Sequence, residues 1–258
     1  MASSQLDYDL LLEAMLPVVE SAGFEIMRYY QQQVDAEIKQ DGSPVTLADK
    51  AAEKVISEGL VECAPDIQVI SEENEASHLI SPPEKFFLID PLDGTKEFLK
   101  SDGSGAFTVN VALIENGFPT FGIIFAPALN RMFYGHRNTV GYEVLNGEHC
   151  KMSPAEISKE QVAVASVSHR DEKTNKWLME NKIGKTVSIG SSIKFCLLAN
   201  GEADVYPRFG PTMEWDTAAG DAILRSAGGM VTHPDGTVFS YGKPGYRNSA
   251  FIARRGHA

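Results

Sequence analysis

A short apolar run that ends in two closely spaced carboxylates constrains this chain more than any other feature. Residues 86–89 read Phe-Phe-Leu-Ile, which is short and aromatic enough for a buried strand, and residues 90–94 continue as Asp-Pro-Leu-Asp-Gly. Pro91 restricts its own φ and lacks a backbone donor, while Gly94 tolerates backbone angles that a side chain forbids. We therefore expect the strand to end here in a sharp turn. Such a turn can point both carboxylates and a backbone carbonyl at one spot, as Mg²⁺ requires.

Each of these dipeptides also has an ordinary structural interpretation. Asp-Pro and Asp-Gly are common turn pairs, and many strands end in them without any function. Two further acidic motifs, Ser71-Glu72-Glu73-Asn74 and Glu214-Trp215-Asp216-Thr217, make a functional site the better interpretation. Alone, the Glu-Glu pair would more often be a solvated loop, and Asp216 could simply cap the helix that follows it. Capping and metal binding are compatible at a helix N-terminus, where the dipole favours a negative charge.

Length and charge limit the classes of protein and partner. With 258 residues, the chain can form one large layered domain or two compact halves. Its hydrophobic content of 43% and charged content of 22% are ordinary for a globular protein. The net charge of −12 makes nucleic-acid polymers poor partners, because their binding depends on Lys and Arg. An anionic small molecule is still possible, since bound divalent cations can reverse the field inside one cleft.

The cysteines and the N-terminal residues indicate the cellular compartment that we expect for this protein. Cys63, Cys150 and Cys196 form no close pair, which argues against a zinc knuckle and a disulfide framework and favours a reducing compartment. The first residues include acids but no basic segment, so we expect no signal peptide, and no apolar run reaches the 18 residues of a membrane span. We expect a cytoplasmic protein. Peripheral association with the inner membrane and the oligomeric state stay open.

Hydrophobic periodicity predicts helices that alternate with strands in the second half of the chain, which is typical of α/β layering. Asn116-Gly117 lies between two apolar runs and predicts a hairpin. The polar stretch 148–161 is the best candidate for a boundary between an N-terminal half, 1–155, and a C-terminal half, 156–258. We expect helices at 6–33, 46–64, 172–180, 194–199 and 217–227, and strands at 68–70, 86–89, within 107–125, and at 132–134, 142–145, 162–166, 186–189 and 204–206.

The turn motif resembles the metal-binding signature of the Mg²⁺-dependent, lithium-sensitive phosphomonoesterases, the superfamily of inositol monophosphatase and fructose-1,6-bisphosphatase. Its pattern there is Asp-Pro-hydrophobic-Asp-Gly-Thr/Ser, and the resemblance extends from about residue 41 to residue 247. The continuation Lys96-Glu97-Phe98 is similar to the branch of 3′(2′),5′-bisphosphate nucleotidases, whereas inositol monophosphatases more typically have Thr-Asn-Phe. The resemblance implies an α/β (α+β) fold, a layered α-β-α-β-α sandwich with the active site between the halves.

The resemblance also implies the metal site. Two or more Mg²⁺ ions would be held by four carboxylates and one backbone carbonyl, those of Glu72, Asp90, Asp93, Asp216 and Leu92. Thr95 would position the attacking water and would itself be oriented by Asp49. The spacing of Thr46 and Asp49 also fits a capping box, so a purely structural role for Asp49 is the alternative.

Substrate contacts are implied in both halves. Gly190-Ser191-Ser192 precedes a predicted helix with Lys194 in its first turn, which is a possible anion site, although Ser-Ser before a helix is usually just a cap. His169, by itself, would more often be a surface histidine. By resemblance, the residues that contact the substrate are Glu72, Asp93, Gly94, Thr95, Lys96, His169, Ser191, Lys194, Arg208 and Asp216.

We therefore expect an enzyme that removes the 3′-phosphate of 3′-phosphoadenosine 5′-phosphate, giving AMP and phosphate, in sulfur assimilation. An inositol monophosphatase or a broad sugar phosphatase with the same metal site is the first alternative. Lys96-Glu97-Phe98 and the segment 191–208 argue against it. A catalytically silent nucleotide-binding module is the second alternative, and the presence of every expected metal and water-positioning residue argues against that.

Overall fold

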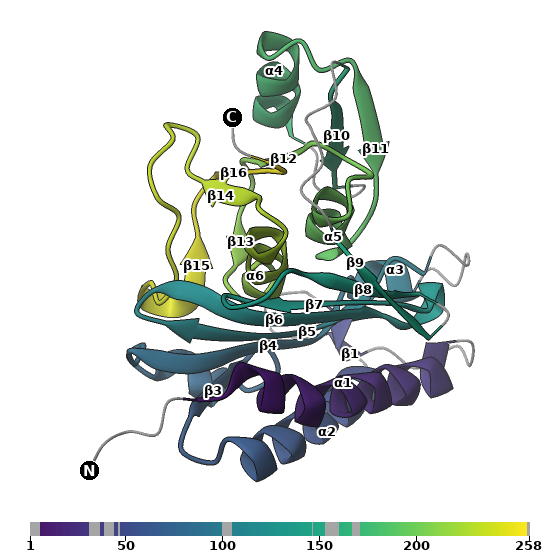
Figure 1. Ribbon diagram of the computed structural model, residues 1–258, viewed down its shortest axis with the longest axis vertical. Coiled ribbons are helices and arrows are strands. Elements are labelled where there is room, and N and C mark those ends of the chain that lie inside the picture. Colours follow the sequence, from purple (N-terminus) through teal and green to yellow (C-terminus); the bar gives the residue numbers. More distant parts are fainter. Residues whose placement is uncertain are drawn as a thin grey trace.

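Two long helices form the outer layer on one side of the molecule (Figure 1). The computed structural model describes residues 6–30, 37–38, 44–45, 47–99, 105–145, 147–152, 160–166 and 171–256. Helices α1 (Tyr8–Tyr30) and α2 (Leu47–Cys63) lie side by side on one face of a large sheet, close to their expected bounds. A buried stripe at helical spacing explains this contact, because it puts apolar side chains on one face of α1: Leu11, Met15, Val19, Ala22 and Ile26.

The large sheet contains seven strands in the order β3-β4-β5-β6-β7-β8-β9. Only β3 and β4 are parallel; the other pairs are antiparallel. The predicted hairpin is confirmed between β5 and β6, where Asn116 and Gly117 both have positive φ, 52° and 79°. The strands are β3 (Gln68–Ser71), β4 (Lys85–Asp93), β5 (Thr108–Glu115), β6 (Phe118–Ala126), β7 (Arg131–His136), β8 (Tyr142–Leu145) and β9 (Glu148–Lys151).

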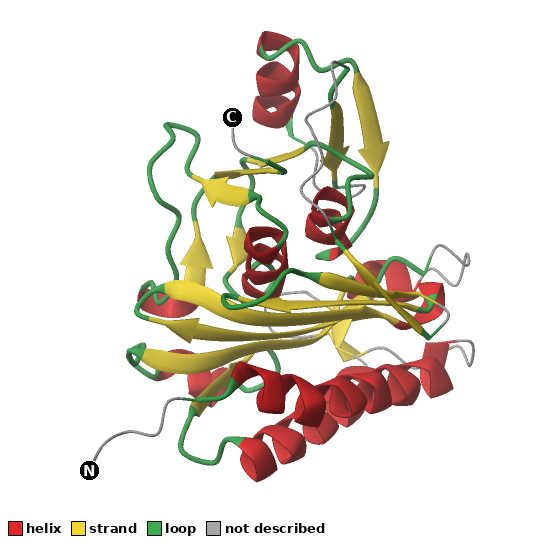
Figure 2. Ribbon diagram, in the orientation of Figure 1, coloured by secondary structure: helices red, strands yellow, loops and turns green. Residues whose placement is uncertain are grey.

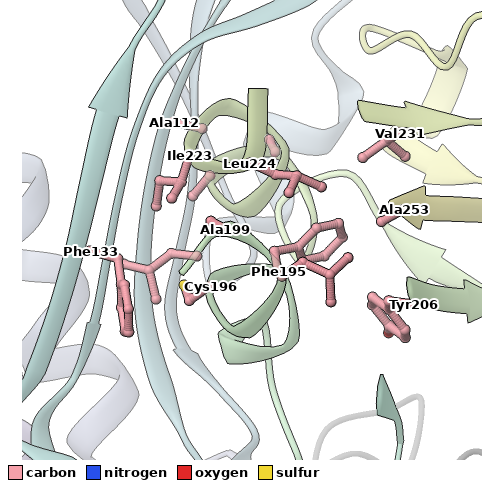
Figure 3. Close-up of a cluster of buried hydrophobic side chains, with 14 of the residues drawn as sticks. Ala112, Phe133, Phe195, Cys196, Ala199, Tyr206, Ile223, Leu224, Val231 and Ala253 are labelled. Atoms are coloured by element: carbon pink, nitrogen blue, oxygen red, sulfur yellow. The ribbon is translucent and has the colours of Figure 1, made fainter. Parts of the chain in front are cut away.

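Two short helices separate this sheet from a second one. Helices α5 (Ile193–Ala199) and α6 (Ala218–Ser226) lie between the sheets in Figure 2. The hydrophobic cluster in Figure 3 runs from Phe133 of the large sheet through Phe195 and Ile223 of the helices to Tyr206 and Ala253 of the second sheet. The two halves of the chain therefore share one buried core.

The second sheet has the order β11-β10-β12-β16-β14, and helix α4 (Glu172–Glu180) covers its outer side (Figure 1). Its strands are β10 (Val162–Ala165), β11 (Lys185–Ser188), β12 (Val205–Arg208), β14 (Met230–Thr232) and β16 (Phe251–Arg254). Smaller elements are β1 (Glu37–Ile38), β2 (Pro44–Val45), α3 (Thr95–Leu99), β13 (Thr212–Met213), β15 (Arg247–Asn248) and 3₁₀ turns at Glu75–Leu79, Pro127–Leu129 and Pro244–Tyr246. The expected α-β-α-β-α sandwich is confirmed.

The structure corrects several details of the prediction. Strand β4 does not end before the acidic motif but continues through it to Asp93, and the turn comes at Gly94. Strands β9, β14 and β16 were not predicted, because their apolar runs are short or their residues exposed. Of the polar stretch 148–161, residues 153–159 lie outside the described part of the chain, so the division near residue 155 stays a prediction. Among the described helices, none is long and apolar enough to cross a membrane.

Candidate active site

A bulge in β4 places the two carboxylates of the acidic motif on one face of the sheet. In a regular strand, residues three apart point to opposite faces. Here Asp90 pairs with Asn110 and Asp93 pairs with Thr108, so three steps along β4 match two steps along β5. Because Thr108 and Asn110 share a face, their partners Asp90 and Asp93 also share one.

Three carboxylates from distant segments meet at this bulge. Oxygens of Glu72, Asp90 and Asp216 lie within 4.8 Å of one another. Glu72 follows β3, and its N–H donates to the Ile89 carbonyl at 3.2 Å, which keeps it beside β4. Asp216 comes from the other half of the chain, just before α6, and its Oδ2 accepts a hydrogen bond from the Met213 N–H at 2.8 Å. The N-cap of α6 is Thr217, so the alternative interpretation of Asp216 as the cap of this helix is wrong.

The hydrogen bonding of Asp90 fits a cation site. Its Oδ1 accepts from the Leu92 N–H at 3.0 Å, whereas its buried Oδ2 accepts no hydrogen bond from the part of the chain that the structure describes. A buried carboxylate oxygen without a partner costs free energy unless a cation approaches it. A cluster made only of carboxylate oxygens matches the hard donors that Mg²⁺ prefers.

Electrostatic repulsion is strong in this cluster. Burial raises the pKa of Asp90 well above its usual range, and the charges of Glu72 and Asp93 raise it further. Burial and the charge of Asp93 raise the pKa of Asp216 to about 7. A divalent cation between these carboxylates would remove the repulsion and favour their ionised forms.

The carboxylates open into a cavity of about 200 Å³ between the two halves of the chain. It collects residues that the sequence places far apart. Nine of the predicted site residues line it: Glu72, Asp93, Gly94, Thr95, Lys96, Ser191, Lys194, Arg208 and Asp216. Asp90 belongs to the same site, because its carboxylate lies within 4.8 Å of those of Glu72 and Asp216. The structure thus brings together carboxylates and basic residues in one concave site.

Thr95 lies at the start of α3, directly after the turn at Gly94. Its hydroxyl donates to the Leu92 carbonyl at 3.1 Å. Asp49 is buried in the first turn of α2, close enough for its charge to raise the pKa of Asp90. Its predicted pairing with Thr95 stays a prediction, and Thr46, its partner in the alternative capping box, lies outside the described residues.

The basic side of the cavity is built on α5 and β12. The ammonium of Lys194 is buried, donates to the Ser191 and Ile189 carbonyls, the latter at 3.4 Å, and lies 5.4 Å from the ring centroid of Tyr206. Burial lowers the pKa of Lys194 to about 8. Arg208 donates from Nε and Nη2 to backbone carbonyls of Gly210 and Pro211, at 3.3 and 3.0 Å. These contacts hold two cationic groups opposite the carboxylates.

Ser191 adopts a left-handed backbone conformation with φ of 46°, which is uncommon for a residue with a side chain. The carbonyl contact from Lys194 supports this conformation. Ser191 is thereby held at the wall of the cavity, where its predicted substrate contact would be made.

Some cavity residues were not assigned from the sequence, and one assigned residue cannot be placed. Glu97, Tyr206 and Thr212 also line the cavity. Glu97 belongs to the Lys-Glu-Phe continuation and Tyr206 to the segment 191–208, which were the available signals, whereas nothing in the local sequence distinguishes Thr212. His169 lies outside the described residues.

Comparisons with known proteins agree with this geometry. The model of the inositol monophosphatase family matches residues 7–257. A relative from Salmonella typhimurium, named 3′(2′),5′-bisphosphate nucleotidase CysQ, is 43% identical over 234 residues, covering 90% of this chain and 94% of the relative. A relative of the same name from Escherichia coli K12 is 39% identical, covering 93% of this chain and the whole relative.

Solved structures agree as well. CysQ from Bacteroides thetaiotaomicron, described as a bacterial member of the inositol monophosphatase family, superposes with a TM-score of 0.82 at 34% identity. That match covers 98% of this chain and all of the other. An IMPase from Thermotoga maritima superposes with a TM-score of 0.78 at 26% identity, covering 95% of this chain and 92% of the other. The chain therefore belongs to the inositol monophosphatase family.

Proposed function

We propose that this protein is a Mg²⁺-dependent 3′(2′),5′-bisphosphate nucleotidase that removes the 3′-phosphate of 3′-phosphoadenosine 5′-phosphate, giving AMP and phosphate. One observation carries the proposal: a cluster of carboxylates faces Lys194 and Arg208 across a single cavity. Carboxylates can hold cations at the phosphate that is cleaved, and the two basic groups can hold a second phosphate that is kept. A substrate with two phosphates matches both sides, and relatives with the corresponding name are 39–43% identical.

Two or more Mg²⁺ ions would be held by Glu72, Asp90, Asp93, Asp216 and the carbonyl of Leu92. The unpartnered Oδ2 of Asp90 supports this assignment. When bound, the ions would supply charge stabilisation for the transferring phosphoryl group and activation of water.

The chain's own groups would orient the reaction. Thr95, oriented by Asp49, would aim the attacking water in line with the bond that breaks. The N–H groups of Gly94 and Thr95 stand at the first turn of α3, where helical N–H groups have no acceptor within the helix, so they can hold the phosphoryl oxygens. Because these donors are fixed before the substrate arrives, they need not reorganise during the reaction.

The kept part of the substrate would lie against the second half of the chain. Ser191, Lys194 and Arg208 would contact the nucleotide and its 5′-phosphate, with Lys96 and His169 as further contacts. We place the enzyme in the cytoplasm and in sulfur assimilation, and a nucleic-acid polymer is not its partner because of the net charge of −12.

A substrate panel with one arginine variant tests the proposal. The native protein should release phosphate from 3′-phosphoadenosine 5′-phosphate faster than from inositol 1-phosphate or fructose 1,6-bisphosphate, and excess EDTA should abolish release. A charge-assisted hydrogen bond contributes ~1.5–3 kcal/mol, so Arg208→Ala should lower kcat/KM for the bisphosphate by roughly 10- to 150-fold. Arg137 is an exposed arginine that does not line the cavity, so Arg137→Ala is the matched control and should leave kcat/KM unchanged.

Adenosine 3′-monophosphate separates substrate recognition from a structural defect. It lacks the 5′-phosphate, so it should be a poor substrate for the native enzyme and hardly worse for Arg208→Ala. Equal losses on both substrates would instead assign Arg208 to the fold or the metal site. Faster turnover of inositol 1-phosphate would favour the inositol monophosphatase activity of the same metal site.

A further inference from the structure

A buried chain of hydrogen bonds joins the two halves directly behind the acidic cluster. Ser192, the N-cap residue of α5, contacts two side chains of the interior strand β5. Its Oγ lies 2.8 Å from Oγ1 of Thr108 and 2.6 Å from Oδ1 of Asn110. All three residues are at most 2% exposed, so water does not compete for these bonds.

In these two hydrogen bonds, the donor follows from which groups carry a proton. The amide oxygen of Asn110 can only accept, so the single hydroxyl proton of Ser192 must point to it. Ser192 then has only acceptor capacity left, and Thr108 must be the donor of the other bond. The sequence of donation therefore runs from Thr108 through Ser192 to Asn110.

The same three residues lie next to two predicted metal ligands. Thr108 and Asn110 are the cross-strand partners of Asp93 and Asp90, on the face that carries both carboxylates. The Asp93 carboxylate lies close enough to the backbone of Ser192 for that backbone group to lower the pKa of Asp93, against the larger effect of burial. Ser192 thus lies near Asp93 and bonds to the two residues of β5 that oppose the bulge.

At the Asn110 end of this hydrogen-bond network, one donor and one acceptor have no partner among the residues that the structure describes. The Nδ2 of Asn110 donates to no described residue, and the Oδ2 of its cross-strand partner Asp90 accepts from none. A buried amide donor beside a buried carboxylate acceptor can orient that carboxylate, or a ligand bound to it, when the site closes around a cation.

We propose that Thr108, Ser192 and Asn110 form a positioning network that holds the carboxylates of Asp93 and Asp90 in the geometry for metal binding. This inference rests on the proposed metal site. The network also joins α5, which carries Lys194, to the strand that opposes the acidic motif. Placement of the basic residue and placement of the carboxylates therefore depend on the same hydrogen bonds.

Direct metal binding tests the network without relying on turnover. Mn²⁺ is titrated into the metal-free protein, and the EPR signal of free Mn²⁺ reports binding. Groups that orient metal ligands typically contribute about 10- to 100-fold to metal affinity, so Ser192→Ala and Thr108→Val should each weaken binding by that factor. The double variant should be little worse than either single variant, because both remove the same network.

Matched variants separate positioning from general stability. Thr108→Ser keeps the hydroxyl and should bind Mn²⁺ like the native protein. Thr120→Val removes another buried hydroxyl of the same sheet, one that bonds to Glu115, and should lower the melting temperature without changing Mn²⁺ affinity. Thr108→Val is nearly isosteric, so it decides the question if Ser192→Ala does not fold.

The outcomes distinguish this inference from the proposed function. If the native protein binds no Mn²⁺, the proposed metal site fails and the network has no ligand to position. If the native protein binds Mn²⁺ and folded Thr108→Val binds it equally well, the metal site stands and the network is overturned. An equal loss in Thr120→Val would also overturn it, because the effect would then follow stability alone.

Discussion

Asp90 stands at the centre of the repulsion in the site. It is buried, one of its oxygens accepts no hydrogen bond within the described residues, and neighbouring carboxylates raise its pKa. Such an arrangement is unfavourable for the metal-free fold. Active sites often keep groups of this kind because binding needs them, at a cost in stability.

The first prediction concerns Asp90→Asn. Replacing this carboxyl by an amide should raise the melting temperature of the metal-free protein at neutral pH, because folding then no longer has to bury or protonate a carboxylate at this position. In Mg²⁺, kcat should fall by orders of magnitude. Melts in EDTA and phosphate release in Mg²⁺ measure the two effects. A variant that is less stable than the native protein in EDTA would show that Asp90 stabilises the fold through contacts other than the metal.

The second prediction concerns Thr95 and Asp49. If they act together on the attacking water, Thr95→Ala and Asp49→Asn should each lower kcat strongly, and the double variant should be little worse than either one. Losses that multiply would return Asp49 to a structural role in α2. A thermal melt of Asp49→Asn is the control, because loss of a cap costs ~1 kcal/mol.

Among the secondary-structure elements, the approach of α6 to the large sheet determines where Asp216 lies. A Cβ atom at Gly122 of β6 would lie 2.4 Å from the Ala219 carbonyl of α6. Only a glycine permits this contact without a backbone shift. Asp216 precedes α6 by two residues, so the distance between helix and sheet sets its distance from Asp90.

The third prediction follows from that contact. Gly122→Ala should destabilise the fold by about 1–3 kcal/mol through overpacking and should weaken Mn²⁺ binding, because α6 moves away from the sheet. Gly184→Ala is the matched control, since a Cβ there meets no atom within 4 Å. Denaturant melts and Mn²⁺ titration of both variants measure the difference. Equal stabilities would mean that the helix can shift without cost.

Across the whole molecule, the metal site couples stability to pH. In the metal-free protein the pKa of Asp93 is raised to about 6 and that of Asp216 to about 7, mainly by burial, above the value of roughly 3.9 for an unfolded chain. Between the unfolded pKa and these raised pKa values, the folded state therefore binds more protons than the unfolded state. Its free energy of unfolding must fall as pH rises through this range.

The fourth prediction concerns this fall in the free energy of unfolding with rising pH. In EDTA the melting temperature should decline between about pH 4 and pH 7, whereas Mg²⁺, which displaces protons from carboxylates, should stabilise the protein more at pH 8 than at pH 5. Asp216→Asn removes one titrating group and should flatten the decline. A Mg²⁺ effect of the same size at every pH would contradict the assignment of these carboxylates as ligands.

Local sequence was enough for many of the elements and for the acidic motif. The periodicity of α1 and α2, the hairpin at Asn116-Gly117 and the bounds of α4 follow from residues that are neighbours along the chain. The short edge strand β9 escaped prediction because its residues are exposed and polar, so its pairing depends on β8 rather than on its own composition.

Local sequence is enough to identify the reactive groups: carboxylates next to two predicted strands and one predicted helix, and basic residues in the second half. How these groups meet depends on the folded chain. The bulge in β4 turns Asp90 and Asp93 to one face, and the packing of α6 on Gly122 brings Asp216 to them. Ser192 stands at the N-cap position of α5, but its side chain bonds to Thr108 and Asn110 of β5 and makes no capping bond. The physical reason is that periodicity and turn angles are local, whereas register and layer spacing arise from contacts between residues far apart in the chain.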